Sequence, residues 1–191
     1  GTPPRRAPYI CSYIGRGTTI PNSYKSQKGE LHQFTFSDIL QNGSISLNEK
    51  LRYSVNDEKI LKKLSYVEKN DMIFPELIRD NIDIKMIGDT LDKGFSYSSR
   101  IIYVRVNKEL YNSVFLSMLL RSDKLQKRLK NEVYVPSNGY KGVSQIRIES
   151  LRNFEIPFIS LEQQAEIMKK EQMKRKKIEE LTKELNNLYN L

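Results

Sequence analysis

The stretch that decides how this chain folds runs from Asn138 to Gln163 and reads NGYKGVSQIRIESLRNFEIPFISLEQ. It begins with a glycine-bearing loop, which leads into extended structure around Ile146. Pro157 prevents a later helix from extending backward, and Ser160 followed three residues later by glutamine is a capping box. The stretch therefore predicts a loop presented by a globular part and, soon after it, the start of a helix.

The helix expected over residues 160–191 is too long and too charged to be buried. From Leu161 onward there is neither proline nor glycine, which allows about 45 Å of helix at roughly 1.5 Å per residue. Two heptads of coiled-coil seam are too short to be stable alone, so this helix requires a partner helix. The residues expected to pair repeat with 3, 4, 3 spacing: Ile178, Leu181, Leu185 and Leu188. Packing on the chain's own domain is the alternative, but the basic run over residues 174–177 favours protrusion.

The basic charge of the chain belongs to the part before this helix. The chain has 191 residues with 32 basic and 23 acidic side chains, a net charge of +9. Residues 1–159 hold 25 of the basic and 17 of the acidic side chains, which leaves +8 for the body. A basic globular body is typical of proteins with a polyanionic partner. General solubility explains the same charge, so charge alone does not decide between the two.

The single cysteine, Cys11, excludes an internal disulfide and a multi-cysteine zinc site. It lies in an apolar stretch, and we expect a small core residue. No apolar run approaches the roughly 20 residues that a membrane-spanning helix needs. We therefore expect a cytoplasmic protein with no membrane partner and no cofactor of its own.

The residues before the long helix predict a mixed α+β domain over residues 9–159, after a flexible lead-in over residues 1–8. Apolar residues at helical spacing predict two helices, one capped by Asn107 and one beginning at Ser122. Runs of β-branched and aromatic residues between turns predict strands, at residues 9–14, 51–55, 72–74, 101–106 and 146–148.

The order of these elements resembles the target-recognition domain and following helix of type I restriction-modification DNA specificity subunits (S subunits). The resemblance spans almost the whole chain. Residues 15–21 resemble the family's Arg-Gly-Lys/Thr-x-Pro turn, and residues 67–73 resemble its strand entry, with Asn70 in the place of a glycine. Residues 97–106 and residues 143–163 are the other two matching segments. No one segment is specific, but their order is.

The resemblance implies a β-rich domain with a curved, largely antiparallel sheet and packed helices, followed by a coiled-coil-type helix. In the family, a complete subunit has two recognition domains and two long helices that pair antiparallel. Each domain reads one half of a split DNA sequence, and the subunit directs an adenine methyltransferase and a restriction subunit. This chain has one such domain and one such helix. It is therefore expected to be half of a longer subunit, or a half-size subunit that dimerises through residues 161–191.

Reading DNA requires polar side chains that reach base edges, on a body held by phosphate contacts. Arginine pairs with guanine and asparagine or glutamine with adenine, so loops that carry such residues are candidates. The residues that we predict to bind DNA are Ser137, Asn138, Tyr140 and Lys141 in the glycine-bearing loop, then Tyr97, Ser98 and Arg100 in a second loop over residues 96–100, and, as weaker candidates, Arg16, Arg52 and Arg79. For each of them, an ordinary solvated loop position is the alternative.

A metal-dependent nuclease is the strongest rival interpretation. Pro75-Glu76 followed by Asp83-Ile84-Lys85 loosely matches a pattern in which carboxylates hold Mg²⁺ and a lysine assists water. The pattern is short and chance matches are common, so a solvated hairpin is the favoured interpretation of these residues. A methyltransferase is disfavoured, because the chain lacks an Asn/Asp-Pro-Pro-Tyr/Phe motif and a glycine loop after a strand.

A coiled-coil adaptor that binds only protein is the non-catalytic rival, and it predicts a body without affinity for DNA. The single histidine, His32, disfavours paired-histidine metal sites and a Ser-His-Asp triad. A general RNA-binding module would need a stacked-aromatic sheet signature that the chain lacks. The sequence therefore favours a recognition module without catalysis of its own.

Overall fold

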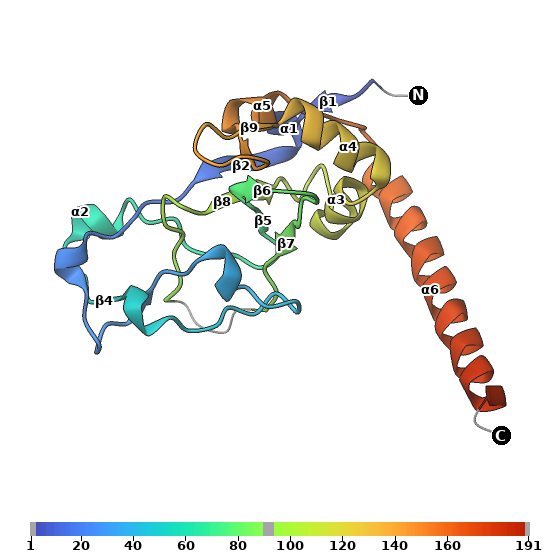
Figure 1. The fold of residues 1–191 in the computed structure, drawn as a ribbon, viewed down its shortest axis with the longest axis horizontal. Coiled ribbons are helices and arrows are strands. Elements are labelled where there is room, and N and C mark those ends of the chain that lie inside the picture. The colour runs from blue at the N-terminus through green and yellow to red at the C-terminus, as the bar shows by residue number, and fades with distance from the viewer. Residues whose placement is uncertain (1–2, 90–93, 190–191) are drawn as a thin grey trace.

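The computed structural model describes residues 3–89 and 94–189 as a mixed α+β body from which one long helix projects (Figure 1). This is the predicted fold class. The α-helices are α1 (Ala7–Ile10), α2 (Glu58–Leu61), α3 (Ser113–Leu120), α4 (Asp123–Glu132), α5 (Ile148–Asn153) and α6 (Leu161–Tyr189). The strands are β1 (Arg5–Arg6), β2 (Cys11–Arg16), β3 (Leu31–His32), β4 (Arg52–Tyr53), β5 (Met72–Phe74), β6 (Leu77–Ile78), β7 (Lys85–Met86), β8 (Ile102–Val106), β9 (Tyr134–Pro136), β10 (Ser144–Ile146) and β11 (Glu155–Ile156).

Among the described residues the strands form four small sheets, and the pairings between named strands are antiparallel. The central sheet has the order β2-β8-β5-β7, and the others are β6-β10-β9, β1-β11 and β3-β4. The strands are therefore distributed over several short sheets. The sequence had led us to expect a single curved sheet. The segment between β2 and β5 contains little regular structure and forms a lobe to one side of the helices, around β3, β4 and α2 (Figure 1).

Strand β8 separates two parts of the core, because side chains alternate between the faces of a strand. Ile102, Val104 and Val106 join the larger buried cluster, which also takes apolar residues from α1, α3, α4 and α5. Tyr103, on the opposite face, joins a smaller cluster with Phe34 and Tyr97, whose ring stacks on Tyr103 at 4.0 Å between centroids. The smaller cluster supports the loops that form the candidate site.

Three local features differ from the sequence prediction. Asn112, rather than Asn107, caps α3, where its side-chain oxygen accepts a hydrogen bond from the backbone N–H of Phe115 at 3.0 Å. The lead-in expected over residues 1–8 is paired from Arg5 onward, because β1 pairs with β11 and Ala7 is buried. The strand expected through Ile148 ends at Ile146, and α5 follows it at once.

Helix α6 begins at the predicted capping box. The backbone N–H of Gln163 donates to the Ser160 hydroxyl at 3.3 Å, and the Gln163 side chain accepts from the backbone N–H of Ser160 at 3.2 Å. Gln164 fixes the first turn to the body, because its Oε1 accepts from the backbone N–H of Asn112 at 2.8 Å and its Nε2 donates to the carbonyl of Ile159 at 2.7 Å. Gln164 is the one buried residue that α6 contributes over its described length.

The rest of α6 extends away from the body (Figure 1). The four residues of the predicted seam, Ile178, Leu181, Leu185 and Leu188, are 53–69% exposed. The predicted protrusion is therefore confirmed, and the partner of the seam stays a prediction. No helix among the described residues is both long enough and apolar enough to cross a membrane.

Candidate nucleic-acid interface

Two loops that lie far apart in the sequence meet at the end of β2. The Arg16 guanidinium donates to the carbonyl of Ser99 at 3.0 Å, and the hydroxyls of Thr19 and Ser99 share a hydrogen bond of 2.6 Å. The backbone N–H of Thr18 donates to the carbonyl of Tyr97 at 2.9 Å. A β-carbon on Gly17 would overlap that carbonyl, so only glycine permits this approach. The predicted candidates Arg16 and Arg100 therefore belong to one surface.

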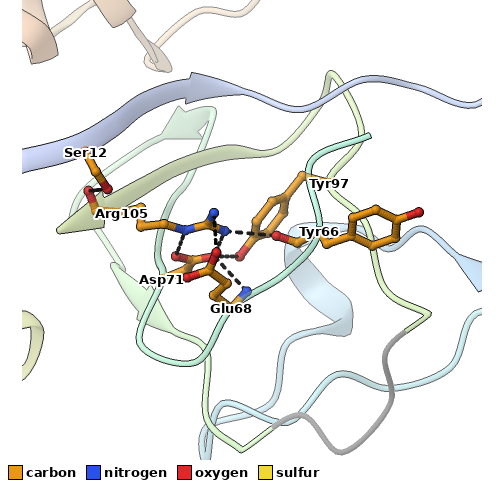
Figure 2. Close-up of polar contacts among 6 residues, drawn as sticks. All are labelled: Ser12, Tyr66, Glu68, Asp71, Tyr97 and Arg105. Atoms are coloured by element: carbon orange, nitrogen blue, oxygen red, sulfur yellow. Dashed lines mark hydrogen bonds and ion pairs between the residues drawn. The ribbon is translucent and has the colours of Figure 1, made fainter. Parts of the chain in front are cut away.

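A largely buried ionic network holds the side chain of Tyr97, whose backbone carbonyl is part of this junction (Figure 2). Asp71 has a side chain only 1% exposed and accepts two hydrogen bonds from Arg105, at 2.8 Å and 2.7 Å. It also accepts from the Tyr97 hydroxyl at 2.8 Å and the backbone N–H of Glu68 at 3.0 Å. Arg105 in turn pairs with the Glu68 carboxylate at 2.7 Å and donates to the carbonyl of Tyr66 at 2.9 Å. A two-point arginine–carboxylate pair of this kind restricts geometry as well as adding energy.

The network changes the acidity of its members. Hydrogen bonding to Asp71 raises the pKa of Arg105 above its ordinary range, against the opposing effect of burial. Burial, with the negative charge of Asp71 beside it, raises the pKa of the Tyr97 hydroxyl above its ordinary range. Both groups therefore keep their protons at physiological pH, and Tyr97 remains a hydrogen-bond donor.

Tyr97 is a correction to the predicted DNA contacts. Its side chain is completely buried and its hydroxyl is bonded to Asp71, so Tyr97 supports the surface from inside. Ser98 is also buried, and its hydroxyl accepts from the backbone N–H of Arg100 at 3.3 Å. Arg100 itself is exposed at the tip of this turn. The sequence could not separate inward from outward positions in a loop that has no regular period.

The glycine-bearing loop forms a closed turn with exposed side chains. The backbone N–H of Ser137 donates to the carbonyl of Val143 at 2.9 Å, and Gly142 has the positive φ of 75° that this closure uses. Tyr140 is 64% exposed, and Asn138 and Lys141 are exposed beside it, whereas Ser137 is half-buried. The loop presents a flat ring, an amide and a cation to solvent.

Residues 76–79 join the two surfaces. Glu76 pairs with Arg16 at 2.8 Å, and its carbonyl accepts from the backbone N–H of Ile146 at 3.0 Å. Strand β6 then pairs with β10, at the base of the glycine-bearing loop. A shallow hollow of about 300 Å³ lies between this strand and that loop, lined by Leu77, Ile78, Arg79, Tyr140 and Val143. The candidates Arg16, Arg100, Tyr140 and Lys141 thus lie along one connected set of elements, which we call the recognition surface.

Arg52 lies in another part of the molecule. It belongs to the β3–β4 sheet in the lobe, where its Nε donates to the carbonyl of Gly29 at 2.6 Å. Its Nη1 lies 3.5 Å from the Glu49 carboxylate. These contacts hold the Arg52 guanidinium against the lobe. They do not connect Arg52 to the recognition surface.

The residues of the nuclease pattern are separated in the structure. Glu76 is paired with Arg16, and Lys85 donates to the carbonyls of Phe36 and Ile39 at 3.0 Å and 2.8 Å. Lys85 belongs to β7, which pairs with β5, whereas Glu76 precedes β6, which pairs with β10 in another sheet. Over the described ranges, no three His, Cys, Asp or Glu side chains are grouped closely enough to hold a metal ion. Lys85 therefore has a structural role, since these two carbonyls hold its ammonium group over the Phe36 ring.

Sequence comparisons identify no matching family model and no matching curated protein. Structural comparison does find related folds. The HsdS subunit from Thermoanaerobacter tengcongensis superposes with a TM-score of 0.61 at 19% identity, over 94% of this chain and 43% of that one. The type I restriction-modification S subunit from M. genitalium gives 0.53 at 16% identity, over 94% and 40%.

The chain has the fold of type I S subunits. A third structure, which concerns complex assembly and conformational transition of the type I restriction-modification system, gives a TM-score of 0.60 at 15% identity, over 94% and 39%. The resemblance in the sequence is therefore confirmed at the level of the fold. The chain spans about two fifths of the length of each of these matched structures.

Thr19 and Glu76 were not predicted to belong to a DNA-binding surface, and Glu76 was named only in the nuclease pattern. Both acquire their positions through tertiary contacts, with residues 80 and 60 positions away. Arg105 could have been noticed, because a charge within an otherwise apolar strand requires a buried or partly buried partner. The sequence alone does not say that Asp71 is this partner, since the two are 34 residues apart.

Proposed function

We propose that the chain is the DNA-recognition half of a type I specificity subunit, and that it has no catalytic activity of its own. Its recognition surface reads one half of a split target in duplex DNA. Arg16, Arg100 and Lys141 supply phosphate and guanine contacts, and Asn138 and Tyr140 supply an amide and a ring at the glycine-bearing loop. The observation that carries the proposal is the S-subunit fold over 94% of the chain.

The charge and the geometry of the body support this function. The body carries a net charge of +8, which favours approach to a polyanion. The buried Asp71–Arg105 pair lies next to the junction between Arg16 and Ser99. The side chains of this junction are therefore held in place before DNA binds. Preorganisation of this kind reduces the ordering that binding would otherwise require.

Helix α6 has a role separate from that of the recognition surface. Its exposed seam pairs with the helix of a second recognition half, either a second copy of this chain or the remainder of a longer subunit. The pair of helices sets the distance between two half-sites. The assembled subunit then directs a modification subunit that methylates adenine with S-adenosylmethionine, and a restriction subunit, in the cytoplasm.

Selection from a random duplex pool tests the reading function. The chain is mixed with duplexes that contain a randomised core, retained duplexes are amplified over several rounds, and the products are sequenced. We expect a short motif to be enriched, or two copies of it at fixed spacing if the chain dimerises. The variant Arg100→Gln should change or weaken the motif, whereas the matched change Arg52→Gln should leave it as it is. Retention of DNA without any motif would reject sequence reading, and no retention would reject DNA binding altogether.

A protein-only adaptor is the second candidate, because the exposed seam of α6 is what such an adaptor would also present. The same selection separates the two functions. An adaptor associates through α6 and retains no duplex at low salt, whereas a recognition half retains duplex through the body.

A further inference from the structure

A cavity of about 500 Å³ lies beside the recognition surface, between the lobe and the central sheet. Residues on both sides line it, including Phe36 and Tyr53 from the lobe and Phe74 from β5. Its volume is within the range of about 300–1,000 Å³ that small-molecule sites occupy. Arg100 belongs both to the recognition surface and to the cavity lining, but the interior of the cavity has no part in the proposed reading of base edges and phosphates.

The wall of the cavity is mainly aromatic and aliphatic. Phe34, Phe36 and Tyr53 line it together with Ile101, and aromatic walls of this kind accept flat ring systems. The one buried amide in the wall, that of Gln33, is already satisfied. Its Oε1 accepts from the backbone N–H of Ile20 at 3.1 Å, and its Nε2 donates to the carbonyl of Thr18 at 2.8 Å. The interior therefore suits a ligand with a planar, largely apolar face.

The rim of the cavity carries positive charge. Lys25 and Arg100 both line it and both are exposed, and within residues 3–89 and 94–189 neither forms an ion pair. The one carboxylate at the rim, Glu76, is neutralised by Arg16 at 2.8 Å. Asn22, also exposed at the rim, can donate and accept hydrogen bonds. A cavity with aromatic walls and a cationic rim is complementary to a flat ring that carries an anionic group.

We propose that this cavity binds a nucleotide, with the base against the aromatic wall and a phosphate at the rim beside Lys25 and Arg100. The nucleotide has two possible sources. One is a base of bound DNA that has rotated out of the duplex, since a base stacked inside the duplex cannot reach the cavity wall; this source rests on the proposed DNA-binding function. The other is a free nucleotide, which does not depend on it.

Fluorescence can test the site directly, because the chain has no tryptophan. Phe36→Trp adds one fluorophore to the cavity wall and preserves the stacking of the ring beneath Lys85, which lies 4.5 Å from the Phe36 centroid. The four deoxynucleoside 5′-monophosphates are titrated singly, and then a duplex retained in the selection experiment is titrated. Lys25→Met is added to this background to remove the rim charge, and Lys28→Met is its matched control, an exposed lysine of the same loop outside the cavity.

The proposal expects at least one monophosphate to quench the fluorescence, and Lys25→Met to weaken that binding about tenfold while Lys28→Met does not. Quenching by the duplex, with competition by the monophosphate, assigns the ligand to a rotated base. Quenching by the monophosphate alone assigns the cavity to a free nucleotide. Absence of quenching by every probe overturns the nucleotide site, and a parallel gel-shift assay shows independently whether the chain still binds DNA. Quenching that Lys25→Met leaves unchanged also overturns it, because the phosphate would then lie elsewhere.

Discussion

The core of the body buries its apolar side chains, whereas helix α6 exposes most of its own. In the body, Met72, Ile73 and Ile102 of the central sheet are completely buried. On α6, Leu181 and Leu185 are 53% and 55% exposed, and the body holds the first two turns, through Gln164 and Met168. The body thus carries its own core, whereas the distal part of α6 has an apolar face that only another chain or segment can cover. The difference separates reading DNA, which we assign to the body, from pairing, which we assign to the helix.

The reactivity of cysteine should show the largest contrast between the two regions. Burial raises the pKa of the Cys11 thiol from 9.0 to about 12, and the thiolate is the reactive form. At pH 8 we expect iodoacetamide to modify Cys11 on the order of a thousandfold more slowly in the folded than in the unfolded chain. Asn186→Cys on α6, in a Cys11→Ser background, should react at the rate of the unfolded chain, as followed by mass spectrometry. Fast modification of Cys11 in the folded chain would show that the core is open.

The buried ionic network should account for the next largest effect. Asp71→Ala leaves the Arg105 guanidinium without its buried partner, and we expect the free energy of unfolding to fall by about 3 kcal/mol. Glu68→Ala removes the other carboxylate that pairs with Arg105. The Glu68 side chain is 51% exposed, so its loss should lower the free energy of unfolding by less than about 1 kcal/mol. Urea denaturation of both variants measures the difference. Equal losses would mean that burial of Asp71 does not distinguish the two ion pairs.

The seam of α6 should affect association and leave the body intact. We expect Leu181→Asp with Leu185→Asp to weaken self-association at least about tenfold, because two charges enter the a and d positions. Asn186→Asp with Asn187→Asp adds the same charge to α6 outside the seam and is the control. Sedimentation velocity over a range of concentrations measures association, and thermal melts test the body. Equal association of the two variants would place the contact elsewhere.

The smallest effect should come from a single cation of the recognition surface. We expect Lys141→Gln to weaken duplex binding about fivefold, which corresponds to roughly 1 kcal/mol. Lys63→Gln removes an exposed lysine next to α2 in the lobe and should leave the affinity unchanged. Fluorescence anisotropy with a labelled duplex provides the measurement. If both variants bind equally well, the glycine-bearing loop is not a DNA contact.

The sequence was most informative where local rules decide the structure. The capping box at Ser160 marked the start of α6, and the absence of proline and glycine from Leu161 onward predicted its length. Helix α5 was missed, because an apolar residue such as Ile148 is equally compatible with a strand and with the first turn of a helix.

The candidate site could be predicted only in part, because tertiary contacts assemble it. Arg16 and Ser99 are 83 residues apart, and nothing local indicates that they meet. Tyr97 and Arg100 belong to the same loop, yet one is buried and the other exposed. The hydrogen bond from Tyr97 to Asp71 decides which way the ring points, and a loop without a regular period cannot reveal this.

The salt dependence of duplex binding tests most directly whether the body binds DNA through its recognition surface. The dissociation constant is measured from low to moderate salt for the unaltered chain and for a variant with Arg16→Gln, Arg100→Gln and Lys141→Gln. We expect a steep linear dependence of log Kd on log salt, and a slope that is shallower by about 0.9 for each phosphate that the variant no longer neutralises. An unchanged slope in the variant, or binding that does not respond to salt, would contradict the assignment of this surface to DNA.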